Sequence, residues 1–418
     1  MNRIKTLLHK LLRKSERYTK TDMVYLAREG GWLVGEKIVT GVAIFFSAVV
    51  FANLLPEETF GTYKFVLSVV ALLSIISLPG INTAIVNWVA RGEKVTRMSF
   101  FIRLKWGIIM AITIFGISIY YYLNGDRTLA LALFIAAIFS PLMEALSVYA
   151  AKLNGEKKFK KLATFQSVSQ IIAFGGLFLA LYLTDSVVVI LLSYFLIWIS
   201  LNLIFYSLSI RDDNPKESLN KELVRYGKNI TAMNILSTIA AHIDKLLLFH
   251  FLGATELAVY VIATAPLEQL RGILQITSPL AQPKFAQRSR EEVRSTIFPK
   301  ILHFVFVAIA IAIVYIVLAP LLFSVFFPRY PEAVLLSQVF AISLLAVNNI
   351  PRVIFESQQM VKESYIFKIF AGTTRIVLIV SLVIPLGVWG VIYARVTAEI
   401  IIFLFSLILI KKLKPARA

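Results

Sequence analysis

The sequence contains no cysteine among its 418 residues, and only 16% of them are charged. The lack of cysteine excludes a disulfide framework, a thiolate metal site and a cysteine nucleophile. Soluble globular chains carry roughly 25% charged residues, so the shortage of charge excludes an ordinary soluble enzyme. The chain also lacks a G-x-x-x-x-G-K-[ST] motif, which excludes ATP hydrolysis on a phosphate-binding loop of that kind.

Long apolar runs fill the chain instead, and 58% of its residues are hydrophobic. A transmembrane helix needs about 20 predominantly apolar residues, and twelve runs approach that length. These runs centre on residues 31–54, 63–88, 103–123, 128–150, 162–183, 186–208, 228–252, 257–282, 302–326, 333–355, 365–385 and 388–410. The sequence therefore predicts an all-α, polytopic membrane protein with about twelve transmembrane helices.

Positive charge is unevenly placed, with 43 Lys and Arg against 24 Asp and Glu and a net charge of +19. The excess lies in residues 1–29, in residues 411–418 and in every second connection between spans, whereas the other connections hold almost none. The positive-inside rule then predicts a multi-pass protein of the plasma or inner membrane with both termini in the cytoplasm. We interpret the net charge as this topology signal and as attraction to membrane lipids, rather than as a nucleic-acid interface.

A weak internal repeat divides the chain into two halves. The shift that places Arg28 on Arg225 also places Leu55 on Leu252 and Tyr63 on Tyr260. Two parallel repeats of six helices predict two lobes around a central cavity. The expected domains are a basic amphipathic segment, an N-terminal lobe, a cytoplasmic linker, a C-terminal lobe and a basic tail, at residues 1–29, 30–210, 211–227, 228–410 and 411–418.

Three segments resemble a known family of transporters. They are Leu54–Tyr63, Gly80–Arg91 and Ile243–Gly253, and they are similar to segments of the polysaccharide, or O-antigen, flippases of the multidrug/oligosaccharidyl-lipid/polysaccharide exporter superfamily. The resemblance implies a flippase that moves a polyprenyl-(pyro)phosphate-linked oligosaccharide from the cytoplasmic to the outer leaflet by alternating access, for cell-surface polysaccharide biosynthesis. It implies a lipid-linked anionic saccharide as substrate, other polysaccharide-assembly proteins as partners, no cofactor and no enzymatic activity.

Five of the basic residues inside predicted spans are the candidate ligands for an anionic headgroup: Lys37, Lys245, Arg271, Arg375 and Arg395. Each costs roughly 2.5–3.5 kcal/mol at the centre of a lipid-facing helix, so we expect them to face the interior or water. Glu268 and Glu399 lie at helical spacing from Arg271 and Arg395, which predicts an ion pair within each helix. Arg375 has no such neighbour, and an unpaired guanidinium near mid-membrane suits bidentate contact with a diphosphate.

Other intramembrane residues are candidates for coupling transport to an ion or for bending the helices. Glu144, His242 and Asp244 are candidates for coupling transport to a proton or cation, while no cluster of residues has the spacing of metal ligands. Prolines and glycines interrupt equivalent spans of the two halves and are candidate hinges or gates: Pro79, Gly80, Pro266 and Pro279.

Two alternatives remain open. A cation-coupled multidrug or organic-cation antiporter of the same superfamily predicts an acidic cavity, whereas the cations in these spans equal or outnumber the unpaired acids. A membrane-embedded polysaccharide polymerase or ligase predicts a sizeable outer loop with acid and base groups, whereas the corresponding connections here are only a few residues long.

Overall fold

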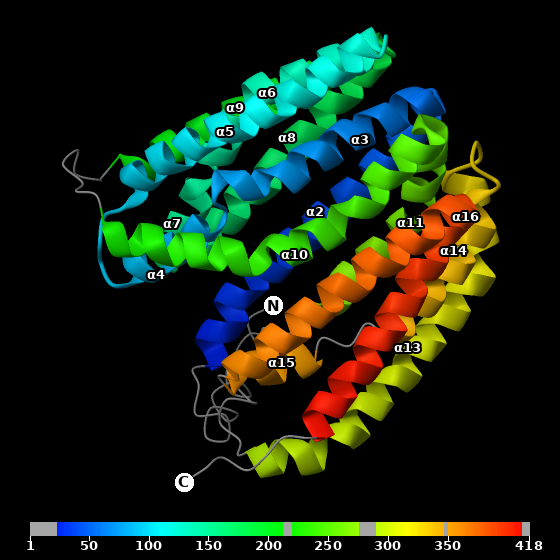
Figure 1. The fold of residues 1–418 in the computed structure, drawn as a ribbon. Helices are drawn as coiled ribbons and strands as arrows, with labels where there is room; N and C mark the ends of the chain where they lie inside the picture. Colours follow the sequence, from blue (N-terminus) through cyan, green and yellow to red (C-terminus); the bar gives the residue numbers. More distant parts are fainter. Residues whose placement is uncertain (1–22, 212–219, 276–289, 347–349, 359, 412–418) are drawn as a thin grey trace, which may run out of the picture.

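The computed structural model describes residues 23–211, 220–275, 290–346, 350–358 and 360–411, and these residues form long helices without a strand (Figure 1). The basic amphipathic segment expected at residues 1–29 lies mostly outside this range. The N-terminal half contains α2 (Met23–Leu54), α3 (Glu57–Leu73), η1 (Ser74–Ser77), α4 (Gly80–Ala90), α5 (Thr96–Leu123), α6 (Arg127–Leu146), α7 (Val148–Gly155), α8 (Phe159–Leu183) and α9 (Val187–Ile210). The C-terminal half contains α10 (Lys221–Leu252), α11 (Ala254–Gln275), α13 (Arg290–Phe326), α14 (Ala333–Ala341), η2 (Ile342–Ala346), α15 (Ile350–Ser357) and α16 (Val361–Lys411).

The helices account for the twelve predicted spans. Within the described residues, 9 helical segments are long and apolar enough to cross a membrane. One of them, α16, has a non-helical residue at Gly387, with φ 58° and ψ −136°, where the chain folds back so that α16 forms two antiparallel arms (Figure 1). With α16 counted as two spans, α11 and the segment α14–η2–α15 complete the set. The predicted fold class is confirmed.

The two ends of the helical bundle differ in their connections. At one end the chain turns sharply between helices, at Pro56, at Gly253, between Phe327 and Glu332, and at Gly387. We call this the short-loop end. The opposite end, where the described connections at residues 91–95 and 156–158 carry Lys and Arg, we call the basic end. Because every full span joins one end to the other, the alternation of charge in the sequence becomes a separation of charge in space.

The internal repeat agrees with the positions of the helices. Ala254, the first residue of α11, is related to Glu57, the first residue of α3, by the same shift that relates Tyr260 to Tyr63. Helices α2 and α10 end at Leu54 and Leu252, which is within one residue of the same shift. The two halves thus repeat one helix order.

The two halves contact each other closely at the short-loop end. Phe65 of α3 stacks on Phe249 of α10, with 3.8 Å between ring centroids. Asn53 Nδ2 donates to the carbonyl oxygen of Phe326 at 2.8 Å, and Arg329 Nη1 donates to that of Asn53 at 3.1 Å. Helix α3 also packs against the start of α11 so tightly that Gly61 has no room for a side chain. We call this set of contacts the outer seal, because the positive-inside rule predicts that the short-loop end faces away from the cytoplasm.

Within the part of the chain that the structure describes, three spans are interrupted partway. Between α3 and α4 the chain passes through η1 and then Leu78, whose φ of 57° is left-handed. A second break, at Ser147, separates α6 from α7, and a third, at η2, follows α14. Broken helices are tolerated in membranes where the freed backbone groups face protein or a water-filled cavity. We therefore expect the freed backbone groups at these breaks to face the space between the halves.

Candidate substrate cavity

A cavity of about 1030 Å³ lies between the two halves. The N-terminal half contributes Ala71, Ser74, Ile75, Pro79 and Glu144, and the C-terminal half contributes residues of α10, α11, η2 and both arms of α16. None of these lining residues belongs to the outer seal. The cavity thus occupies the middle and basic-end part of the inter-lobe space, beneath a closed short-loop end.

Four of the five predicted headgroup ligands line this cavity: Lys245, Arg271, Arg375 and Arg395. They come from α10, α11 and the two arms of α16, so the fold brings together positions far apart in the sequence. Lys37 is not among the lining residues. Its side chain is 63% exposed on α2, and its Nζ lies 3.6 Å from the carboxylate of the adjacent Glu36.

Arg395 is the centre of a polar cluster on the cavity wall. Its Nη2 lies 2.6 Å from Glu268 Oε1, its Nη1 donates to the Tyr260 hydroxyl at 2.9 Å, and the same Nη1 lies 3.6 Å from Asp244 Oδ2. The Tyr260 hydroxyl in turn donates to Asp244. The expected pairing of Arg395 with Glu399 within one helix is wrong, because contacts with α10 and α11 direct the guanidinium away from its own helix.

Arg375 is paired, contrary to the sequence-based expectation. Its Nη2 donates to Glu399 Oε1 at 2.8 Å, across the two arms of α16. The fold-back at Gly387 places Glu399 opposite Arg375, a relation that helical spacing cannot reveal. The expected pair of Arg271 with Glu268 is present, at 3.6 Å, and Arg271 also lies 3.8 Å from Glu399.

The arginines neutralise the acids of the C-terminal wall, and two lysines are left over. Lys245 and Lys368 both line the cavity, and within the described residues neither ammonium group has an ion pair. Lys368 is a residue that the sequence reasoning missed. Its position inside the span 365–385 of the sequence was the available signal.

Lys64 is a further missed cation, close to the same region. Its ammonium group lies over the rings of Phe60 and Tyr63, 5.2 and 5.6 Å from their centroids, and it repels that of Lys245 electrostatically. The charge belongs to α3 of the N-terminal half, whereas Lys245 belongs to α10 of the C-terminal half. Positive charge therefore approaches the inter-lobe space from both sides.

Glu144 is held by Arg103, which the sequence reasoning also missed. Arg103 is 1% exposed, and its Nη2 lies 2.7 Å from Glu144 Oε2. The same guanidinium donates to the Ser77 carbonyl oxygen and hydroxyl, at 3.3 and 3.1 Å, and to the Ser147 hydroxyl at 2.6 Å. One side chain thus joins the break after α3 to the break after α6. The feature of the sequence that could have identified Arg103 was its position, as a basic residue, inside the predicted span 103–123.

The other candidate coupling residues both lie on α10. His242 lines the cavity, and its Nδ1 is buried without a hydrogen-bond partner among the described atoms. Asp244 also lines the cavity, but its carboxylate is engaged by Tyr260 and Arg395. Their predicted coupling role stays a prediction.

The candidate hinges differ from one another. Pro79 and Gly80 lie at the break before α4, and the Gly80 amide donates to the Thr231 hydroxyl of α10 at 3.0 Å. Helix α11 continues through Pro266 without a break, which corrects the expected interruption there. Membrane helices tolerate proline because neighbouring groups compensate for the missing donor. Pro279 lies outside the described residues.

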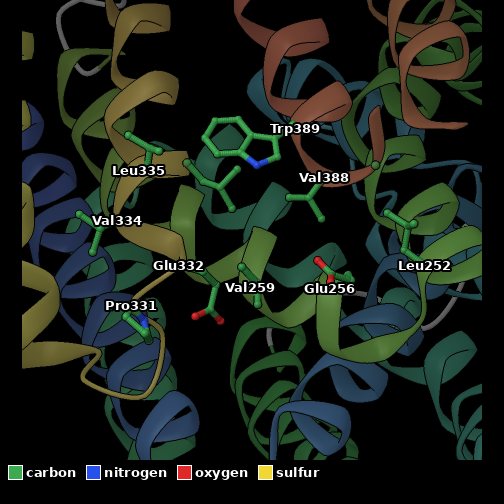
Figure 2. Close-up of a pocket in the computed structure, with 11 residues that line it drawn as sticks. Leu252, Glu256, Val259, Pro331, Glu332, Val334, Leu335, Val388 and Trp389 are labelled. Carbon is green, nitrogen blue, oxygen red and sulfur yellow. The ribbon is translucent and has the colours of Figure 1, made fainter. Parts of the chain in front are cut away.

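A second pocket, of about 610 Å³, opens at the short-loop end of the C-terminal half (Figure 2). Trp389 and several aliphatic side chains form its walls, and the carboxylates of Glu256 and Glu332 lie beside it (Figure 2). Its lining includes two acids and no basic residue. The second pocket thus has an acidic lining, whereas the inter-lobe cavity has five basic residues against four acids.

Comparison with known proteins places the chain in a family. A sequence profile of the polysaccharide biosynthesis protein family matches residues 26–278. No curated protein matches the chain in sequence.

Solved structures share the fold at low sequence identity. An inward-facing multidrug resistance MATE transporter of the MOP superfamily has a TM-score of 0.69 at 16% identity, covering 91% of this chain and 96% of its own. The lipid II flippase MurJ in an inward closed conformation has a TM-score of 0.68 at 14% identity, covering 91% and 87%. A MOP superfamily transporter from Pyrococcus furiosus, whose binding pocket is described as having reverse polarity, has a TM-score of 0.56 at 15% identity, covering 93% and 95%. The chain belongs to the polysaccharide biosynthesis protein family and has the fold shared by the MATE and lipid II flippase transporters, as the resemblance in its sequence implied.

Proposed function

We propose that this protein is a flippase that moves a polyprenyl-(pyro)phosphate-linked oligosaccharide across the membrane by alternating access. The observation that carries the proposal is the charge of the inter-lobe cavity. Its lining includes the basic residues Lys245, Arg271, Lys368, Arg375 and Arg395 against the acids Glu144, Asp244, Glu268 and Glu399. Arginines pair with all four acids, Arg103 with Glu144 among them, so the two lysines stay available to an anion.

A phosphate-linked lipid suits this arrangement for an electrostatic reason. A diphosphate loses hydration when it enters a confined space, and lysine ammonium groups replace that hydration with charge-assisted hydrogen bonds. The lipid tail stays in the bilayer while the headgroup crosses, so the cavity needs to bind the headgroup alone. The polysaccharide biosynthesis family to which the chain belongs supports a saccharide as the cargo.

We further propose the membrane orientation and the domain division expected from the sequence. The basic end lies in the cytoplasm with both termini, in the plasma or inner membrane, because Lys and Arg are retained on that side. Residues 30–210 and 228–410 are the two lobes, and α10 begins slightly earlier, at Lys221. With the outer seal closed, the cavity would be open to the cytoplasmic side. There, other polysaccharide-assembly proteins would deliver the lipid-linked saccharide.

The two alternatives predict different cavities or loops. An organic-cation antiporter needs acids that are free to bind a cation, whereas Asp244, Glu268 and Glu399 each pair with an arginine. A polymerase or ligase needs acid and base groups near its lipid-linked substrate at the outer surface, where the connections here are short. We therefore infer transport without covalent change to the lipid.

The experiment is a translocation assay in proteoliposomes. The purified chain is reconstituted with a polyprenyl-diphosphate-linked oligosaccharide, and a sugar-cleaving enzyme added outside reports how much substrate has reached the outer leaflet. We expect protein-dependent translocation, with the lipid otherwise unchanged by mass spectrometry. Chain extension or ligation without translocation would make the protein an enzyme, and efflux of an organic cation instead would favour the antiporter.

A matched pair of variants connects the activity to the cavity. Lys245→Gln/Lys368→Gln removes both unpaired cavity charges, and we expect translocation to fall at least tenfold, about the value of one charge-assisted hydrogen bond. Lys105→Gln/Lys362→Gln removes the same charge from exposed positions outside the cavity lining, and wild-type translocation is expected. Equal losses in both variants would refute the role of the two cavity lysines.

A further inference from the structure

Glu399 is shared by two arginines that differ greatly in exposure. Its Oε1 lies 2.8 Å from Arg375 Nη2 and 3.8 Å from Arg271 Nη1. The side chain of Arg375 is 36% exposed, that of Arg271 is 6% exposed, and that of Glu399 is 14% exposed. The carboxylate therefore has one close partner on the cavity side and one more distant partner inside the C-terminal lobe.

Arg271 has unused hydrogen-bonding capacity. Its Nε and Nη2 are buried and have no hydrogen-bond partner among the described atoms, and its Nη1 is no closer than 3.6 Å to a carboxylate oxygen. Phe340 lies against the guanidinium, 4.7 Å from ring centroid to Cζ. Buried guanidinium N–H groups in proteins nearly always have partners. Arg271 is thus a fixed cation with donors left for a carboxylate.

Arg395 has no comparable freedom, although it belongs to the same cluster. It contacts Glu268, Asp244 and Tyr260 at once, and its Cζ also lies 4.7 Å from the Phe340 ring centroid. Displacing any one of these partners leaves the other two in place. The pair of Arg375 and Glu399 is the part of the cluster that a ligand entering the cavity can open.

Separating Arg375 from Glu399 would leave the Glu399 carboxylate without its closest cation. A diphosphate that binds the Arg375 guanidinium competes with Glu399 for the same N–H donors. Glu399 is mostly buried, so it cannot recover the lost interaction from bulk water. The Arg271 guanidinium, 3.8 Å away, is the nearest cation with free donors.

We propose that Glu399 is a positioning residue that transfers between two arginines: it pairs with Arg375 when the cavity is empty and moves onto Arg271 when an anionic headgroup takes Arg375. Arg271 then acts as the acceptor for the displaced carboxylate and does not itself bind the phosphate. This inference rests on the proposed function, because it assumes that the cargo presents a phosphate to the cavity.

The test measures binding of geranylgeranyl diphosphate to the full chain in lipid nanodiscs, with uncharged geranylgeraniol as the reference. Glu399→Gln removes the internal competitor, and we expect about tenfold tighter binding of the diphosphate, the value of one charge-assisted hydrogen bond. Arg271→Gln removes the acceptor and holds Glu399 on Arg375, so we expect about tenfold weaker binding. The double variant, which has neither competitor nor acceptor, should bind at least as tightly as the wild type.

Two further variants keep the result interpretable. Arg271→Lys retains the buried charge without the planar fork, and its affinity should fall between those of the wild type and Arg271→Gln. Glu144→Gln removes the same charge from the cavity wall but frees only Arg103, which is 1% exposed. It should tighten binding by less than about twofold, since only long-range electrostatics changes.

Each outcome separates this inference from the proposed function. If the wild type binds the diphosphate no better than geranylgeraniol, the proposed function fails. If the wild type prefers the diphosphate but Glu399→Gln weakens binding, or tightens it no more than Glu144→Gln does, the transfer of Glu399 is overturned and the phosphate site survives. A purely structural role for Glu399 and Arg271 predicts weaker binding in both single variants and in the double variant.

Discussion

Replacing Gly61 with alanine should weaken the outer seal and shift the protein toward a conformation open at the short-loop end. An added Cβ at Gly61 would lie 2.9 Å from the Ala254 Cα, and closer still to the carbonyl group of that residue. Non-bonded carbon atoms rest at about 3.5–4.0 Å, so α3 and α11 would have to separate by roughly 1–2 Å. The obstacle is backbone on both sides, which cannot move aside by a change of rotamer.

The size of the effect follows from the cost of overpacking. Inserting a methyl group into a packed contact typically costs about 1–3 kcal/mol. Because the cost falls on the sealed conformation alone, the ratio of open to sealed molecules should rise by a factor of about 5 to 150.

Double electron–electron resonance is the suitable assay, because the chain has no cysteine and needs no background substitutions. Spin labels on Leu123→Cys and Val325→Cys would report the separation of the two halves at the short-loop end, since these residues are 78% and 61% exposed. We expect Gly61→Ala to add a population at longer distance. Gly116→Ala is the matched control, because nothing lies within 4 Å of a Cβ added there. A Gly61→Ala distribution identical to that of the control would refute the reasoning about the seal.

Two other substitutions test the internal structure of the halves. Arg103→Gln should destabilise the protein by about 3–5 kcal/mol, because it leaves the mostly buried Glu144 without its cation, and the loss should appear as a lower melting temperature in detergent. Adding Glu144→Gln should recover part of that loss, and a double variant no more stable than Arg103→Gln would contradict the ion-pair explanation. Gly387→Ala should cost about 1–3 kcal/mol, since φ 58° with ψ −136° is a conformation that residues other than glycine rarely adopt, and a melting temperature equal to that of Gly116→Ala would argue against strain at the fold-back.

The fold could be predicted from the sequence to a large extent, because each membrane-spanning helix requires a long apolar run that is visible in the sequence. Runs of apolar residues marked the spans, and the repeat that relates Tyr63 to Tyr260 indicated the two halves. The breaks at Ser147 and η2 were not predicted, since no proline or glycine lies at Ser147 or within η2. At Ser147 the hydrogen bond from Arg103 is a tertiary contact, which local sequence preference cannot reveal.

The candidate site was predicted less completely. Lys245, Arg271, Arg375 and Arg395 were identified by their positions inside apolar spans, because a charge in such a span is rare and costly. Their partners could not be derived, since spacing along one helix says nothing of the facing helix. The pairing of Arg375 with Glu399 depends on the chain reversal at Gly387, and that reversal brings together two residues 24 positions apart.

Arg103 also has a mechanical consequence. A helix break is a place where a span can bend, and two breaks in neighbouring spans would ordinarily give the N-terminal lobe two independent degrees of freedom. The Arg103 guanidinium reaches the Ser77 carbonyl oxygen at one break and the Ser147 hydroxyl at the other, so a change at either displaces the same rigid group. We therefore expect the two bends to move together, and Glu144, which pairs with Arg103 and lines the cavity, connects them to the cavity wall.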